Sequence, residues 1–180
     1  MKYLSFILCI GWLVAGVQAA PTDLTEFAAQ VAKTGLPYKY GASRPQEGGL
    51  DCSGFVQFVY KQVYRVKLPD EAGLQLEYLR KHGKVWDATN WNPGDLRPGD
   101  LIFWTGTCPT RRRSPVTHVM IYEGENTMVG AQSAGRRLEG RGAGVGFYRF
   151  YPRRPEGGSM PDDRFYNAQM HLYAYGRLDR

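Results

Sequence analysis

Hydrophobic residues recur at two different spacings along this chain, and the spacing changes about halfway along it. In the first half, apolar side chains return every three or four positions, which predicts helices. The pattern indicates a helix over 22–35 that Asp23 caps, a second that begins at Cys52, and a shorter one over 70–83 that Asp70 opens. The second helix has the most apolar face, which we expect to be buried: Phe55, Val56, Val59, Tyr60 and Val63.

In the second half, short β-branched and aromatic runs are separated by Gly, Asn and Pro turns, which is typical of antiparallel strands. The runs cover 97–104, 116–124, 126–135 and 168–178. The glycine-rich run at 140–146 lacks the helix and lysine of a phosphate-binding loop and is interpreted as a loop or hairpin, and 151–164 as an exposed loop. Helices followed by strands favour an α+β fold over an alternating α/β fold.

The first 19 residues have the organisation of a secretory signal peptide. One lysine precedes an apolar run over 4–17, and Val17 and Ala19 occupy the small-residue positions of a cleavage site. A retained membrane anchor is the less favoured alternative, because the run is shorter than the about 20 residues that span a bilayer. We therefore expect cleavage after Ala19 and one exported domain over 20–180, in the periplasm or outside the cell, without stable membrane insertion.

Composition and net charge limit the classes of molecule that this protein is expected to bind. The chain has 43% hydrophobic residues and 22 glycines, which is typical of a globular, loop-rich protein, and we expect a monomer. The net charge of +6 comes from arginines, three of them at 111–113. An exported basic surface suits cell-wall polymers or lipid headgroups better than nucleic acid, although arginines that only solvate loops are as good an explanation. No metal-ligand spacing occurs, so we expect no metal and no cofactor.

Cys52 is placed to act as a nucleophile. Unsatisfied N–H groups and the macrodipole at a helix N-terminus stabilise negative charge, so this thiol should ionise more readily than a free cysteine. It also needs a base, and His118 is the best candidate because it lies within an apolar strand, whereas His82 and His171 should be exposed. The hypothesis that Cys52 is a nucleophile requires that this cysteine is not held in a disulfide with Cys108. Taken alone, Cys52 and His118 are weak evidence for a catalytic site, because a buried cysteine and a core histidine without a catalytic role are commoner in proteins.

Three segments resemble, in order and spacing, the signatures of the NlpC-type cell-wall cysteine peptidases: "YKYGASRPQEGGLDCSGFVQFVY", "LRPGDLIFW" and "THVMIYEGENTMVGAQSAG". The resemblance covers about 24–135. It implies a papain-like core, with N-terminal helices packed on a small antiparallel sheet, in an enzyme that cleaves peptidoglycan stem peptides, often after D-glutamate. It also implies that Cys52 is the nucleophile and His118 its base, and that three residues line the substrate groove: Tyr38, Asp51 and Ser53.

One position departs from the family pattern. A third polar residue, His, Asn or Gln, usually follows the base by about twelve positions, and this chain has Gly130 there. Gln132 lies two positions further on the same strand face and is the candidate substitute, with a backbone carbonyl or a water as alternatives. Three functions stay open: a stem-peptide endopeptidase, an N-acetylmuramoyl-L-alanine amidase or antibacterial effector of the same chemistry, and a non-catalytic wall-binding module.

Overall fold

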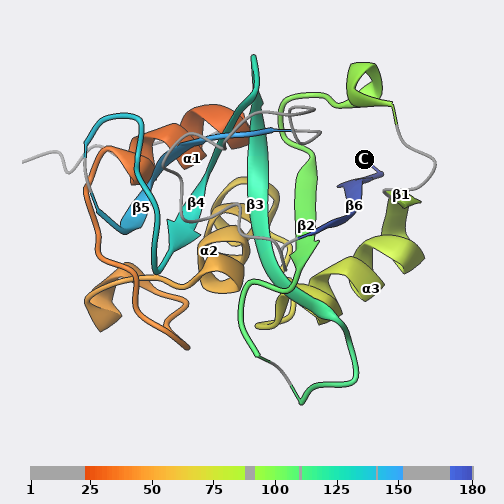
Figure 1. Ribbon diagram of the computed structural model, residues 1–180, viewed down its shortest axis with the longest axis horizontal. Helices are drawn as coiled ribbons and strands as arrows, with labels where there is room; N and C mark the ends of the chain where they lie inside the picture. Colours follow the sequence, from red (N-terminus) through yellow and green to blue (C-terminus); the bar gives the residue numbers. More distant parts are fainter. Residues whose placement is uncertain (1–22, 88–91, 110, 141, 152–170, 180) are drawn as a thin grey trace, which may run out of the picture.

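The chain forms its helices first and its sheet afterwards, as the hydrophobic pattern predicts (Figure 1). The computed structural model describes residues 23–87, 92–109, 111–140, 142–151 and 171–179. Its α-helices are α1 (Leu24–Ala32), α2 (Cys52–Tyr64) and α3 (Ala72–His82), with short 3-10 helices at Pro45–Glu47 and Pro93–Asp95. Its strands are β1 (Gly83–Asp87), β2 (Leu101–Thr105), β3 (Val116–Gly124), β4 (Thr127–Gln132), β5 (Gly144–Arg149) and β6 (His171–Leu178). The α+β class is therefore confirmed.

Side-chain caps fix where the first two long helices begin. Asp23 accepts a hydrogen bond from the Glu26 amide at 3.0 Å and caps α1 as predicted. Asp51 caps α2 by accepting from the Gly54 amide at 2.7 Å. The prediction for α3 is wrong by one residue, because Glu71 rather than Asp70 is its N-cap and no side chain caps it.

The strands form one antiparallel sheet in the order β1-β6-β2-β3-β4-β5. The four strands expected from the sequence are present. The two at the outer edges, β1 and β5, were not predicted as strands (Figure 1). Of the run at 140–146, which was expected to be a loop or hairpin, Gly144–Gly146 begin β5, the strand that returns antiparallel along β4, so the hairpin alternative is the one observed. Glycines weaken a strand signal locally, and only the neighbouring strand supplies the hydrogen bonds.

All three helices pack against one face of the sheet. α2 lies over β3 and β4, and the apolar face predicted from its sequence is buried at Phe55, Val56, Val59 and Tyr60. The opposite face has a smaller cluster of its own, made of Ile102, Trp104, Met120, Tyr122, Met128, Tyr148 and Phe150. Burial on both faces keeps the central strands in one register, so the start of β3 has a fixed position beside the N-terminus of α2.

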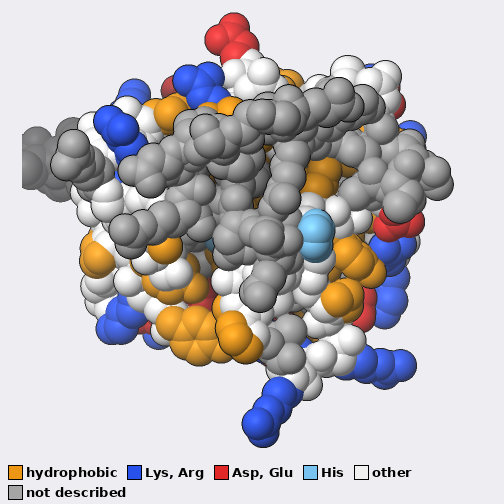
Figure 2. Space-filling view, viewed as in Figure 1, with side chains coloured by type: hydrophobic (Ala, Val, Ile, Leu, Met, Phe, Trp, Pro, Cys, Tyr) orange, Lys and Arg blue, Asp and Glu red, His pale blue; other side chains and the backbone are white. Residues whose placement is uncertain are grey.

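Two features bear on how the protein meets its surroundings. No helix among the described residues is long and apolar enough to cross a membrane. The expected signal peptide (1–19) lies outside those residues, as does the expected loop at 151–164 except for its first residue. On the face shown in Figure 2, the coloured Lys and Arg side chains lie in separate groups around the edge rather than in one patch. That arrangement suits solvated loops at least as well as a single anionic partner.

Candidate active site

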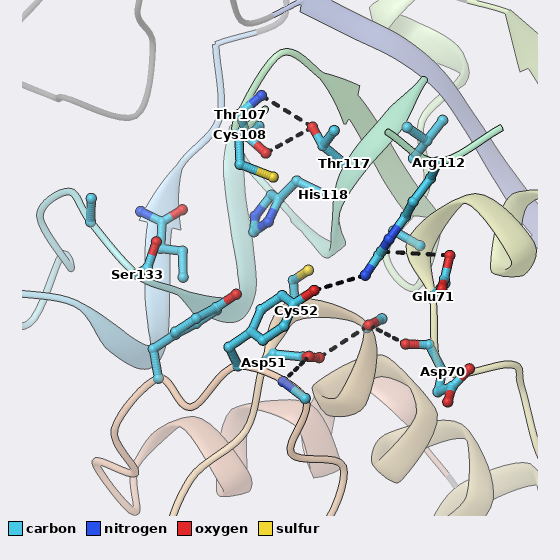
Figure 3. Close-up of a pocket in the computed structure, with 18 of the residues that line it drawn as sticks. Asp51, Cys52, Asp70, Glu71, Thr107, Cys108, Arg112, Thr117, His118 and Ser133 are labelled. Atoms are coloured by element: carbon cyan, nitrogen blue, oxygen red, sulfur yellow. Dashed lines mark hydrogen bonds and ion pairs between the residues drawn. The ribbon is translucent and has the colours of Figure 1, made fainter. Parts of the chain in front are cut away.

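A pocket of about 540 Å³ opens where the N-terminus of α2 meets the sheet. Its wall comes from the loop before α2, the start of α3, the β2–β3 loop, and the adjoining ends of β3 and β4 (Figure 3). All of the site residues that the sequence singled out line this one pocket: Tyr38, Asp51, Cys52, Ser53, His118 and Gln132. The fold thus brings together residues that span most of the described chain.

Asp51 organises the start of α2, and with it the position of Cys52. One carboxylate oxygen accepts from the Gly54 amide at 2.7 Å, and the other accepts from the Gly41 amide at 2.8 Å. The same carboxylate therefore caps the helix and holds the preceding loop against it. Gly54 tightens this junction, because a Cβ atom there would overlap the backbone of Ala42 and Ser43.

Ser53 and Gln75 connect α2 to α3. The Ser53 hydroxyl lies 2.7 Å from the backbone oxygen of Asp70 and 3.0 Å from the carboxylate of Asp51, and its single proton is donated to one of them at a time. The buried Gln75 amide donates to the backbone oxygens of Ser53 and Pro69, each at 2.8 Å. No motif in the sequence indicated Gln75. Its signal was a polar residue on the buried stripe of α3, beside Leu76.

His118 reaches the pocket from β3. Its cross-strand neighbour is Trp104 on β2, with the two ring centroids 5.7 Å apart. His118 is 5% exposed and Cys52 8% exposed, and in Figure 3 the two side chains lie one above the other in the pocket. His82 and His171 are exposed, as predicted. The histidine that the sequence favoured is thus the one in the pocket with the cysteine.

Gln132 lies on the strand next to His118. The pairing of β3 and β4 ends with Ile121 opposite Val129, and beyond it His118 and Gln132 both line the pocket. Gln132 is 2% exposed, yet neither polar atom of its amide has a hydrogen-bond partner among the described residues. The expected hydrogen bond from Gln132 to His118 is therefore not formed in this structure.

Gly130 is explained by its neighbour on β3. A Cβ atom at position 130 would lie 2.9 Å from Cε and 3.1 Å from Cγ of Met120. The methionine side chain therefore fills the space beside the glycine. A histidine at position 130 would displace Met120 from a buried cluster before it could orient His118.

Burial determines the charge state of Cys52 and His118. It raises the pKa of the Cys52 thiol to about 12, and the Asp51 carboxylate adds to the rise while the Val119 and Ser53 amides oppose it. Burial also lowers the pKa of His118 to about 3. The thiol and the imidazole are then both neutral near pH 7. The expectation that this thiol at a helix N-terminus ionises more readily than a free cysteine is wrong, because removing the thiolate from water has the larger effect on its pKa.

We expect the alkylation of Cys52 by iodoacetamide to reach its midpoint above pH 8.5, the pKa of a free cysteine. The sign follows from the raised thiol pKa: the reactive thiolate becomes populated only as the pH approaches that raised value. The rate, which should still be rising at pH 10, is measured from pH 6 to 10 in a Cys108→Ser background, with glutathione as reference and Cys52→Ser as blank. A plateau below pH 7 would instead reveal a thiolate–imidazolium pair.

Tyr38 and Cys108 complete the surroundings of the thiol. Tyr38 forms a parallel bridge with Leu50, and burial, followed by the charges of Cys52 and Asp51, raises the pKa of its hydroxyl above the usual range. The hydroxyl therefore keeps its proton and can donate. Cys108 is exposed, lines the same pocket and, like Cys52, is a free thiol.

The β2–β3 loop adds to the pocket a charged residue that no sequence motif indicated, Arg112. Arg112 lines the pocket and contacts both Tyr40 and Glu71. Among the described residues, no group of three or more His, Cys, Asp or Glu side chains could hold a metal ion. The chemistry that this pocket offers is therefore that of a thiol, an imidazole and hydrogen-bond donors.

Curated relatives match about half of this chain. It is 30% identical over 105 residues to the murein DD-endopeptidase MepH of Escherichia coli (strain K12), which is 58% of this chain and 34% of the relative. It is 33% identical over 97 residues to the gamma-DL-glutamyl hydrolase of Bacillus subtilis (strain 168), which is 54% of this chain and 20% of the relative. The chain thus spans about a third or less of the length of these curated relatives.

Solved structures agree with the sequence matches. NlpC1 from Trichomonas vaginalis superposes with a TM-score of 0.51 at 26% identity, over 74% of this chain and 42% of that one. Residues 35–146 match the sequence profile of the NlpC/P60 family. That range includes all six predicted site residues and more than half of the chain. The pocket, the profile and the relatives lead to one conclusion: this chain belongs to the NlpC/P60 family.

Proposed function

We propose that this protein is a peptidoglycan hydrolase that cleaves an amide bond of the stem peptide, as an endopeptidase, with Cys52 as nucleophile and His118 as general base. The observation that carries the proposal is the pocket that a thiol at a helix N-terminus shares with one imidazole, two residues that are 66 positions apart in the sequence. The relatives support the substrate class, since two of them are named a murein endopeptidase and a gamma-DL-glutamyl hydrolase.

The neutral pair determines the order of the proton transfers. As the Cys52 sulfur attacks the carbonyl carbon, its proton passes to the His118 imidazole. The C–N bond then breaks, and the imidazolium returns the proton to the departing amine, which leaves a thioester on Cys52. Water attacks the thioester with His118 again as base, and this step releases the acid product and the free thiol.

The helix N-terminus supplies the charge stabilisation. The first N–H groups of α2, at Cys52 and Ser53, have no carbonyl acceptor within the helix and can donate to the oxyanion of the tetrahedral intermediate. The caps and close contacts at Asp51 and Gly54 hold these donors in place before the substrate arrives. Tyr38, Asp51 and Ser53 are proposed to line the substrate groove, with the Tyr38 hydroxyl as a donor beside the thiol.

Digestion of purified sacculi, with the fragments identified by mass spectrometry, tests the proposal. An endopeptidase releases cut stem peptides, whereas an amidase or an effector of that chemistry frees whole stems from the glycan. A non-catalytic module binds the sacculi and releases no fragments. This alternative stays open because Gly130 stands where the family usually has a third polar residue. Export through residues 1–19 and a monomeric state are part of the same proposal, and fractionation and light scattering test them.

Gln132→Ala is expected to lower turnover several-fold without eliminating it. If the amide orients the imidazole in the substrate complex, its loss removes one orienting group while the thiol, the base and the helix N–H donors remain. The measurement is steady-state kcat and KM on a stem peptide, with Gln30→Ala, an exposed glutamine of α1 outside the pocket, as the control. A variant indistinguishable from wild type assigns the orienting role to a backbone carbonyl or a water, and removes Gln132 from the site.

A further inference from the structure

Two thiols share the pocket, and the proposed hydrolysis uses only one of them. Cys52 begins α2, whereas Cys108 belongs to the loop that joins β2 to β3. Both line the pocket, and Figure 3 shows the two side chains directed into it from different walls. Neither thiol is in a disulfide in this structure, so the pocket holds a second sulfur nucleophile to which hydrolysis assigns no role.

The structure keeps Cys108 near the pocket without tying down the residue itself. The preceding residue is fixed to β3, because the amide and the hydroxyl of Thr107 lie 3.1 and 2.8 Å from the Thr117 hydroxyl. Cys108 makes no hydrogen bond among the described residues. A disulfide requires two Cα atoms within about 7 Å of each other. The loop can supply such an approach, while the capped start of α2 holds Cys52 in place.

The two thiols differ in how easily a reagent reaches them. Cys108 is exposed, whereas Cys52 is only 8% exposed. Thiol–disulfide exchange needs access to the attacking sulfur, so an oxidant from solution reacts with Cys108 first. Exported proteins meet an oxidising environment, in which neighbouring thiols form disulfides. The pair therefore has the arrangement from which an exposed thiol passes its oxidation on to a buried one.

We propose that Cys108 is a redox modification site that forms a reversible disulfide with Cys52 and so switches the enzyme off. The oxidant is a low-molecular-weight disulfide such as glutathione disulfide. The Cys108 thiolate attacks one sulfur of the oxidant, releases one glutathione and keeps the other in a mixed disulfide. The Cys52 thiolate then attacks the Cys108 sulfur and releases the second glutathione. Two electrons and the two thiol protons thus pass to the oxidant, which becomes two molecules of glutathione.

The disulfide occupies the sulfur that has to attack the substrate carbonyl. This inference therefore rests on the proposed function, because it names a regulation of the same site. A dithiol reductant reverses the reaction by attacking the exposed Cys108 sulfur, which returns both cysteines to the free thiols of this structure. The enzyme is then active in a reducing environment and inactive in an oxidising one.

The test equilibrates residues 20–180, the form expected after export, with buffers of reduced glutathione and rising glutathione disulfide. Cys9 is absent from this form, so Cys52 and Cys108 are its only thiols. Iodoacetamide blocks the remaining thiols, and mass spectrometry of tryptic peptides identifies the cross-link. We expect Cys52 joined to Cys108, and sacculus digestion about 10-fold slower when nine tenths of the protein is cross-linked. Dithiothreitol should restore the rate of the reduced protein.

Two variants separate the cross-link from other effects of oxidation. Cys108→Ser should keep digesting sacculi at the rate of the reduced wild type, because little of Cys52 is exposed to glutathione. The double variant Cys108→Ser/Arg113→Cys moves the thiol to an exposed position of the same loop that does not line the pocket. It should acquire glutathione at position 113 without a cross-link to Cys52.

The outcomes distinguish this inference from the proposed function. Glutathione that stays on Cys108, with no peptide joining it to Cys52, overturns the inference and leaves the proposed function untouched. An equal loss of digestion in wild type and Cys108→Ser assigns the loss to direct modification of Cys52 and also overturns it. Cross-linked protein that digests sacculi as fast as reduced protein rejects both, because Cys52 is then not the nucleophile. If reduced protein digests nothing, the proposed function and the switch fail together, whatever the peptide map shows.

Discussion

Replacing Cys52 by alanine or serine is expected to lower sacculus digestion by about 10⁴-fold or more, since loss of a nucleophile leaves only the contribution of binding and oxyanion donors. Serine tests the chemistry most strictly. It keeps the shape of the side chain, but a hydroxyl needs a stronger base than an imidazole whose pKa burial lowers to about 3. The measurement is the release of soluble fragments from purified sacculi over time.

Loss of digestion identifies Cys52 as the nucleophile only if the Cys52→Ala and Cys52→Ser proteins remain folded. Cys52 is the first residue of α2, and its side chain makes no cap, so the melting temperature should change by only a few degrees. Cys108→Ser is the matched control, because it removes the other free thiol of the same pocket. It should digest sacculi at the wild-type rate. Digestion by Cys52→Ser at that rate would show that another group is the nucleophile.

Gly54→Ala is expected to reduce the free energy of unfolding by about 3 kcal/mol, the upper part of the range for overpacking. Alanine is favoured over glycine inside a helix by up to about 1 kcal/mol, so an unhindered site would be stabilised. Here the added methyl group would overlap the backbone of Ala42 and Ser43, and the loop that carries Tyr38 would have to move away from α2. Urea denaturation followed by circular dichroism measures the change.

Gly140→Ala is the control for this substitution. No heavy atom lies within 4 Å of a Cβ atom at position 140, and the backbone there does not need a glycine. Its effect should stay within about 0.5 kcal/mol. If Gly54→Ala were as stable as this control, the loop and the helix would not be locked together as the structure indicates, and the preorganised oxyanion donors would lose their support.

Local signals in the sequence determined the helices and the central strands. Asp23 and Asp51 precede apolar residues at helical spacing, and both cap a helix. The runs that became β2, β3 and β4 are rich in β-branched and aromatic residues, which satisfy a buried sheet on either face. The motif around Cys52 and the position of His118 within an apolar strand identified the two residues that share the pocket. Each of these features depends on residues close together in the chain.

Contacts between segments that are distant in the chain determined the edge strands and the environment of the site. No local sequence pattern predicts such contacts. β1 and β5 are strands because β6 and β4 supply their hydrogen bonds. The raised pKa of Cys52 comes from burial against other parts of the fold, which outweighs the helix N-terminus that the sequence could show. Arg112 reaches Tyr40 across 72 positions of the chain. Tertiary packing alone determines how far each ionisable group is removed from water and which side chains come into contact. It therefore determines the charge states of the pocket residues, whereas the sequence already indicated their residue types.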